Sequence, residues 1–178
     1  MKIIRHITIA LLMLFTFIFA SCGAGSTKPS EDTREFFGVR MGDDSTTVVR
    51  ELRKNKIAHL DSISGGAGWM NFMKQPSGFM LYDDELWEML SVHLVNGKTN
   101  VVRLTNSYPT RQEAEKEYRG MARRLSTLYA LQMTDKDHQD FVIMKCIATT
   151  QQGGLTFALT NAKSLNGRPI YNVVLEFY

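Results

Sequence analysis

The sequence predicts an α+β domain in which one antiparallel sheet carries two amphipathic helices packed on one face. Two observations predict this class: two apolar stripes with helical spacing, and several runs in which apolar and polar residues alternate. Helix followed by antiparallel strands occurs twice, at about 43–107 and 110–178. No residue-level repeat accompanies this order, so a helix-plus-sheet pseudo-repeat stays an option rather than a conclusion.

The first 22 residues have the pattern of a lipoprotein export signal. Lys2 and Arg5 form a basic start, and Ile7–Phe19 is an apolar stretch of 13 residues. Residues 19–22, Phe-Ala-Ser-Cys, resemble the bacterial lipobox, which most often has Leu at the first position. A retained transmembrane helix would need about 20 apolar residues, and ordinary secretion would need no cysteine at the cleavage point. We therefore expect residues 1–21 to be a lipoprotein signal peptide.

Cleavage there would make Cys22 the lipidated first residue of the mature protein. Acyl chains such as palmitate anchor a protein stably when two or more are attached. The loop-forming residues after it predict a flexible tether, so that 22–35 is lipidated cysteine and tether and 36–178 is a single domain. Because Gly23 rather than aspartate follows the cysteine, we expect an outer-membrane protein that faces the periplasm.

Processing also changes the charge and the cysteine count. Loss of Lys2 and Arg5 leaves 19 basic against 18 acidic residues, so the mature chain is nearly neutral. Without a basic run, a nucleic-acid partner is not expected. Cys146 becomes the only thiol, which excludes an intramolecular disulfide and predicts a small buried hydrophobe.

The first structural elements of the domain are a short strand and a helix. Phe36–Met41 is predicted to be a strand. Asp44 or Ser45 can cap the helix that follows, in which Val48, Val49 and Leu52 share one face.

The second helix has the stronger signature. Thr110 and Glu113 form a capping box, in which each side chain can satisfy a backbone donor of the other. A pair between Glu115 and Arg119 is expected on the outer face. The apolar stripe comprises Ala114, Tyr118, Met121, Leu125 and Leu128.

The strands are predicted from alternation. Leu90, Val92 and Leu94 precede an Asn96-Gly97 hairpin signal. For the apolar Val102 and Leu104 to share their face, we expect a three-residue loop or a bulge near Gly97 rather than a tight two-residue Asn-Gly turn. Residues 141–148, apolar on both faces, favour a central strand; residues 155–160 and 171–177 alternate, and the C-terminal run should be paired within a sheet.

These features, in this order, resemble short uncharacterised lipoproteins of Gram-negative gut bacteria. The residues that carry the resemblance are Phe36–Gly42, Val48 and Leu52 of the first helix, Gly78-Phe79, Val92–Val102, Tyr118 and Leu125, and Tyr171–Tyr178. The family implies no activity.

Two fold-level likenesses are more distant. A glycine before a capped helix and a sheet resembles the small lipoprotein of the outer-membrane barrel-assembly machinery, which is about half as long. The repeated helix-plus-sheet layout resembles beta-lactamase inhibitor protein, whose disulfides this chain lacks. Both imply protein binding rather than catalysis.

The motifs of common enzymes are absent from the sequence. It contains no Gly-x-Ser-x-Gly, His-Glu-x-x-His or Cys-x-x-Cys. Asp135, Asp137 and Asp140 resemble the first half of a calcium loop, but the sixth position is Asp140 instead of glycine and the twelfth is Cys146 instead of glutamate. A solvated loop is therefore expected there, with an ion site as the alternative.

Other clusters have simple structural interpretations. Asp83-Asp84 is expected to be a turn between Tyr82 and Leu86. His93 is placed on the polar side of its strand. Trp69, Phe72 and Phe79 would form a binding patch if they are exposed together.

The sequence thus predicts a non-enzymatic, lipid-anchored envelope protein without a cofactor. It would contact the membrane through the lipid on Cys22 and bind an envelope protein as its partner. A small envelope hydrolase with a dispersed active site is the alternative.

Overall fold

The computed structural model describes residues 34–60, 67–76, 78–134, 141–164 and 166–178, which belong to one compact unit. The described residues form one large antiparallel sheet, two small hairpins and two helices, α2 (Ser45–Lys54) and α3 (Arg111–Leu125). The predicted α+β class with an antiparallel sheet is confirmed. Neither of these helices has the length and apolar character needed to span a membrane.

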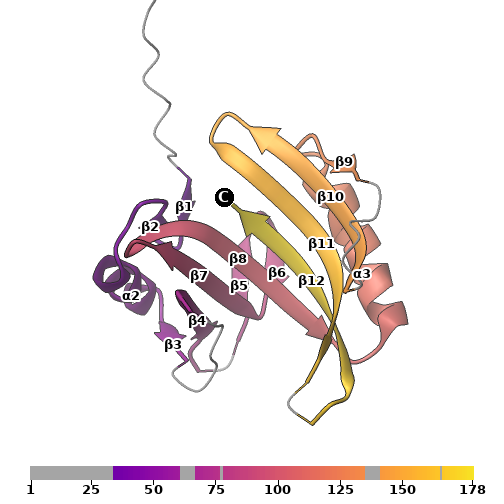
Figure 1. Ribbon diagram of the computed structural model, residues 1–178, viewed down its shortest axis with the longest axis horizontal. Coiled ribbons are helices and arrows are strands. Elements are labelled where there is room, and N and C mark those ends of the chain that lie inside the picture. The colour runs from indigo at the N-terminus through magenta and orange to yellow at the C-terminus, as the bar shows by residue number, and fades with distance from the viewer. Residues whose placement is uncertain (1–33, 61–66, 77, 135–140, 165) are drawn as a thin grey trace, which may run out of the picture. The chain divides into compact units, whose positions relative to one another are not determined.

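Eight strands build the large sheet, in the spatial order β3-β4-β7-β8-β12-β11-β10-β9, with every neighbour antiparallel (Figure 1). They are β3 (Ile57–His59), β4 (Trp69–Lys74), β7 (Met89–Val95), β8 (Lys98–Tyr108), β9 (Gln132–Met133), β10 (Val142–Thr150), β11 (Gly153–Lys163) and β12 (Pro169–Phe177). The small hairpins are β1 (Glu35–Phe36) with β2 (Val39–Arg40), and β5 (Met80–Tyr82) with β6 (Glu85–Trp87).

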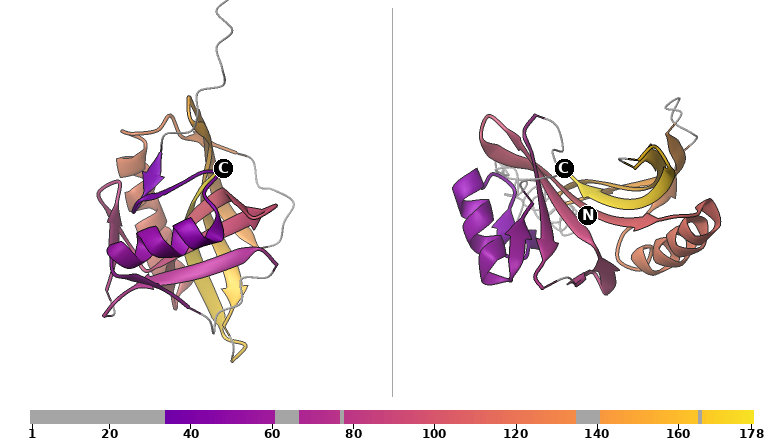
Figure 2. Two further views of the ribbon diagram at one scale, coloured as in Figure 1. Left: turned by 90° about the vertical axis from the view of Figure 1, so that its left-hand side faces the viewer. Right: turned by 90° about the horizontal axis from the view of Figure 1, so that it is seen from below.

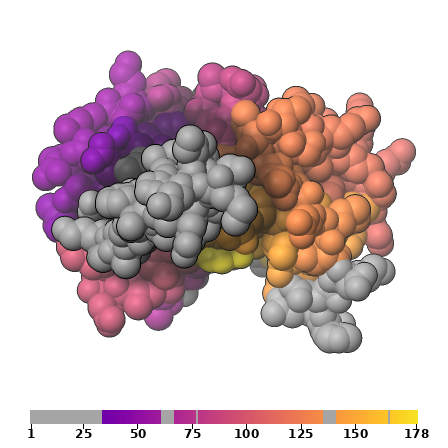
Figure 3. Space-filling model, turned by 90° about the horizontal axis from the view of Figure 1, so that it is seen from above, coloured from indigo at the N-terminus to yellow at the C-terminus, as the bar shows by residue number. Residues whose placement is uncertain are grey.

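The C-terminal run is paired within the sheet, as predicted, and as β12 it has a neighbour on both sides, β8 and β11. The prediction of a central strand at residues 141–148 is wrong, since β10 is followed only by the two-residue β9. Seen from above, the earlier half of the described unit and its later half occupy opposite sides, with yellow β12 between them (Figure 3).

One face of the sheet forms the core. Leu90, Leu104, Leu175 and Phe157 are successive register partners on β7, β8, β12 and β11, and all are fully buried. Because side chains alternate across a strand, this row identifies the core face along the whole sheet.

Helix α3 packs on this face through Tyr118. Its ring stacks on Phe157 at 4.6 Å between centroids, and its hydroxyl lies 3.2 Å from the sulfur of Cys146. Burial, which disfavours the charged phenolate, raises the pKa of Tyr118. Cys146 is 5 % exposed, as expected of a small buried hydrophobe.

Thr110 is confirmed as the N-cap of α3, whereas Glu113 contacts the Thr110 hydroxyl rather than completing the predicted box through the Thr110 backbone N–H. The backbone N–H of Glu113 donates to the Thr110 hydroxyl oxygen at 3.3 Å, while that hydroxyl donates to the Glu113 carboxylate at 2.7 Å. On the outer face, Glu115 pairs with Arg111 at 2.7 Å rather than with Arg119.

The apolar stripe of α3 is one residue shorter than predicted. Ala114, Tyr118, Met121 and Leu125 are buried, but Leu128 is 55 % exposed because the helix ends at Leu125. The next two residues explain this ending: the hydroxyls of Ser126 and Thr127 donate to the carbonyls of Arg123 and Arg124, both at 2.7 Å. Such local bonds compete with continued helix.

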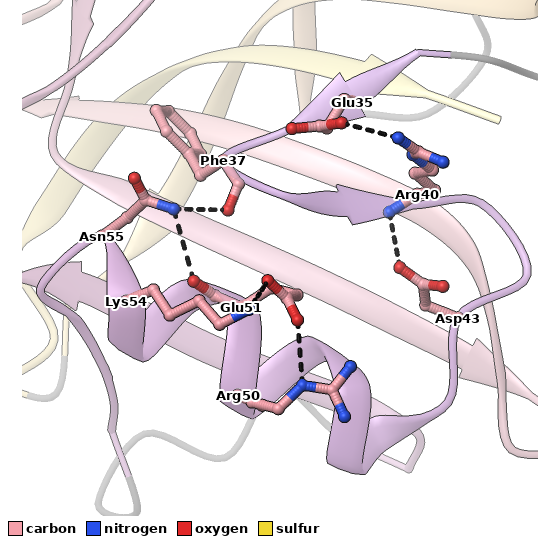
Figure 4. A network of polar contacts seen from close by, with 8 residues as sticks. All are labelled: Glu35, Phe37, Arg40, Asp43, Arg50, Glu51, Lys54 and Asn55. Carbon is pink, nitrogen blue, oxygen red and sulfur yellow. Dashed lines mark hydrogen bonds and ion pairs between the residues drawn. The ribbon is translucent and has the colours of Figure 1, made fainter.

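Helix α2 begins as predicted, with Asp44 as its cap. The Asp44 carboxylate accepts from the N–H of Thr47 at 2.8 Å, and this hydrogen bond lowers the pKa of Asp44. At the other end, the Asn55 amide donates to the carbonyl of Phe37 at 2.8 Å, which ties the β1–β2 hairpin to the helix (Figure 4). Val48 and Leu52 are buried in the core.

The hairpin of β7 and β8 contains both a tight turn and a bulge. Val95 pairs with Lys98, so Asn96 and Gly97 form a two-residue loop, each with positive φ (51° and 74°). The register then shifts between His93 and Leu94, which brings Val92 opposite Val102. The predicted bulge is confirmed, but the expectation that it would replace the tight Asn-Gly turn is wrong, because the register shift lies beyond the turn, at His93 and Leu94.

Candidate functional site

The face of the sheet opposite the core is hollowed into an open depression of about 670 Å³. Its lining comes from β4, β7, β8, β10, β11 and β12, together with Phe141. Ser91, Arg103, Glu176 and Thr156 form a register row across its middle. These residues alternate with the core residues along their strands, so they point to the other side of the sheet.

An aromatic and ionic cluster lies within the depression. The guanidinium carbon of Arg103 stands 4.2 Å from the centroid of the Trp69 ring, and Trp69 in turn lies 4.8 Å from the ring of His93. Arg103 also pairs with Glu176 at 2.6 Å, with a second hydrogen bond at 2.7 Å. The side chains of Arg103 and Glu176 are 37 % and 23 % exposed, so the pair remains accessible.

Hydrogen bonds between neighbouring strands fix the polar groups in and beside the depression. The Ser91 hydroxyl donates to the Asn71 amide oxygen at 2.7 Å. The Ser107 hydroxyl donates to the Asn172 amide oxygen at 2.9 Å. Because the side chains are held by strands rather than by loops, their positions are set before any partner arrives, which lowers the entropic cost of binding.

The arrangement suits recognition of a polypeptide surface. Six strands at about 4.8 Å spacing make the lined face roughly 24 Å wide, which is broad for a small ligand that must be mostly enclosed. Tryptophan and arginine are the residues most often found at the energetic centre of protein interfaces. The Glu176 carboxylate is engaged by Arg103, so it is not placed as a free base.

The three residues of the predicted aromatic patch lie in different places. Trp69 is half-buried on the open face, whereas Phe72, three residues further along β4, is fully buried in the core. Phe79 is 56 % exposed and lies just before β5. An odd separation along a strand puts two side chains on opposite faces, so the structure does not bring the three together.

The other predicted site residues cannot be placed. Cys22 and the acidic run with Asp135, Asp137 and Asp140 fall outside the described residues. Within the described residues, no group of three or more His, Cys, Asp or Glu side chains is arranged to hold a metal ion.

Arg103 and Glu176 were missed by sequence reasoning. They are 73 residues apart and meet only because β8 and β12 pair in the middle of the sheet. The available signal was weak: Arg103 and Glu176 have opposite charges and stand among uncharged neighbours in their two strands.

The chain was compared with known proteins at three levels. Comparisons with protein-family models, with curated protein sequences and with solved structures find no match to this chain.

Proposed function

We propose that this protein is a lipid-anchored accessory protein of the cell envelope, which binds a partner protein and catalyses no reaction. The observation that supports this most directly is the open depression lined by Trp69, Arg103 and Glu176. It offers an aromatic ring, a guanidinium and fixed hydroxyl and amide groups on a rigid sheet. We place the partner protein on this face.

The order of elements supports a duplicated architecture as part of the proposal. Helix α2 is followed by β3, β4, β7 and β8, and helix α3 by β9, β10, β11 and β12. The sheet order is then symmetric about the β8–β12 pair. Each helix stands near one end of the sheet (Figures 1 and 2). We infer a helix-plus-sheet pseudo-repeat with both helices on the core face, which leaves the other face for the partner.

The anchor belongs to the same proposal. Residues 1–21 would be removed, Cys22 would carry the lipid, and the residues up to 35 would form the tether. The protein would then sit on the outer membrane and face the periplasm, as a member of the short envelope lipoproteins that its sequence resembles.

Metabolic labelling with palmitate tests the anchor. The full chain should incorporate the label, and Cys22→Ser should lose all of it because the acceptor thiol is gone. Cys146→Ser is the matched control, since it removes the other cysteine of the chain, and it should label like the parent. Labelling that persists in Cys22→Ser would contradict the anchor.

Site-specific photocrosslinking in cells tests the binding face. A photoreactive residue at Thr156, next to Glu176 in the register row, should give a discrete adduct with a partner protein. The adduct should fall at least tenfold when Trp69 is replaced by alanine, the scale of a loss at an interface centre. A photoreactive residue at Lys116, exposed on α3, is the control and should give none. Absence of any adduct, together with turnover of an envelope substrate, would favour the hydrolase alternative.

A further inference from the structure

The β5–β6 hairpin presents large apolar side chains to solvent. Leu81 and Leu86 are directly opposite each other in the hairpin and are 62 % and 55 % exposed, and Phe79 just before it is 56 % exposed. Three such side chains close together on one exposed element form a patch of the kind that marks an interaction site.

The hairpin cannot turn these side chains inward. Its other face is already in the core, where Met80 is 2 % exposed and Trp87 is fully buried. Asn106 on β8 holds the hairpin through two hydrogen bonds. Its side-chain NH₂ group donates to the carbonyl of Leu86 at 2.7 Å, and its side-chain oxygen accepts from the N–H of Glu88 at 2.8 Å.

Two further contacts fix the hairpin to the region of α3. Glu85 forms a two-pronged ion pair with Arg124. Tyr129 donates its hydroxyl to Asp83 at 2.5 Å, in the predicted turn whose residues Asp83 and Asp84 both have positive φ. The pKa of Asp83 is raised by burial. The exposed leucines are thus held in place by the fold itself.

A groove of about 530 Å³ lies between the hairpin, β8 and α3. Phe79, Leu86 and Met121 give it an apolar lining. Four carboxylates also line it, those of Asp84, Glu85, Glu88 and Glu117, and Arg124 is the one cation among the groove-lining residues, which gives a formal charge of −3. An apolar surface that carries this charge is complementary to a partner with the opposite charge.

Tyr108 lines this groove, and the direction of its pKa shift is consistent with the negative charge of the groove. Its pKa is raised by burial first and then by the negative charges of Glu117, Glu88 and Glu85. The negative charge of Glu85 is largely compensated by its ion pair with Arg124. One oxygen of Glu88 accepts from the N–H of Ser107 at 3.0 Å. Asp84 and Glu117 are therefore the residues to substitute, because neutralising them leaves the hydrogen bond of Glu88 and the ion pair of Glu85 intact.

We propose that this hairpin groove docks a cationic amphipathic segment of a partner polypeptide. Its apolar side chains would cover Leu86 and Phe79, and its lysines or arginines would meet the carboxylates of Asp84 and Glu117. The groove shares no lining residue with the depression on the open face, so the proposal adds a second interaction surface and does not depend on the first.

Binding of labelled helical peptides to the purified full chain tests this. A peptide of leucine and lysine should bind at least tenfold more tightly than one with glutamate in place of lysine, and the binding should weaken as salt is raised. The double variant D84N/E117Q should lose about tenfold in affinity for the lysine peptide. Leu86→Ser should lose a comparable factor because it removes apolar contact.

The matched control is E35Q/E115Q, which removes two negative charges from exposed ion pairs outside the groove. It should bind the lysine peptide like the parent chain. The proposal is overturned if the two peptides bind equally, or if the control loses as much affinity as D84N/E117Q. It is also overturned if the parent chain sediments as a dimer that Leu86→Ser dissociates, since a second copy would then cover the hairpin. Failure here leaves the crosslink from Thr156 unaffected.

Discussion

Phe157→Ala is expected to lower the free energy of unfolding by about 3–5 kcal/mol, the usual cost of removing a fully buried phenylalanine. Phe157 is 0 % exposed, lies in the central row of the core and stacks in parallel on Tyr118. Its removal leaves a cavity directly beneath α3 and deprives Tyr118 of its stacking partner. Urea denaturation, followed by circular dichroism, measures the change from the shift of the midpoint at constant slope.

Two variants serve as controls for this prediction. Phe157→Leu keeps most of the volume and should cost less than about 1.5 kcal/mol. Phe141→Ala removes the same ring from a position that is 52 % exposed, and should change the free energy of unfolding by less than about 0.5–1 kcal/mol. A loss below about 1 kcal/mol for Phe157→Ala would mean that α3 does not pack on this row.

Gly153→Ala is expected to destabilise the protein by about 2–4 kcal/mol, through backbone strain and a lost strand contact together. Gly153 has φ of +120°, a conformation that residues with a Cβ rarely adopt. A Cβ there would lie 2.6 Å from the carbonyl oxygen of Tyr178. That carbonyl accepts from the N–H of Gly154 at 2.7 Å, so its displacement would detach the end of β12.

Gly97→Ala serves as the comparison variant. Gly97 also has positive φ, at +74°, but nothing lies within 4 Å of the position of its Cβ. This variant should show the cost of a positive φ without a close contact, about 1 kcal/mol. If urea denaturation gives equal losses for both variants, the close approach of Tyr178 contributes nothing and the prediction for Gly153 is wrong.

Much of the fold could be predicted from the sequence because its signals are local. The N-caps at Thr110 and Asp44 and the turn at Asp83-Asp84 depend on side chains within a few residues of one another. The bulge near Gly97 could be predicted because residues on one face of a strand alternate, and only a register shifted by one residue puts Val102 opposite Val92. The end of α3 was missed because Ser126 and Thr127 interrupt a periodicity that continues to Leu128.

The place of β10 and the candidate site required long-range information. An apolar run on both faces is typical of a central strand. In the structure β10 instead lies beside the short edge strand β9, and its two faces are still covered differently: one lies under α3 and the other lines the depression. Trp69 was noticed as an aromatic residue, yet its partner Arg103 could be found only from the pairing of β4, β7 and β8. Strand order, unlike strand pattern, is not encoded within a short window.

The central position of β12 has a consequence for biosynthesis. The strand that joins the two halves of the sheet is the last of its eight strands in chain order. Until that strand is made, β8 and β11 each lack a neighbour, and both halves expose unpaired edges that invite aggregation. The two halves of the sheet therefore cannot be joined before the last of its strands in chain order has been synthesised.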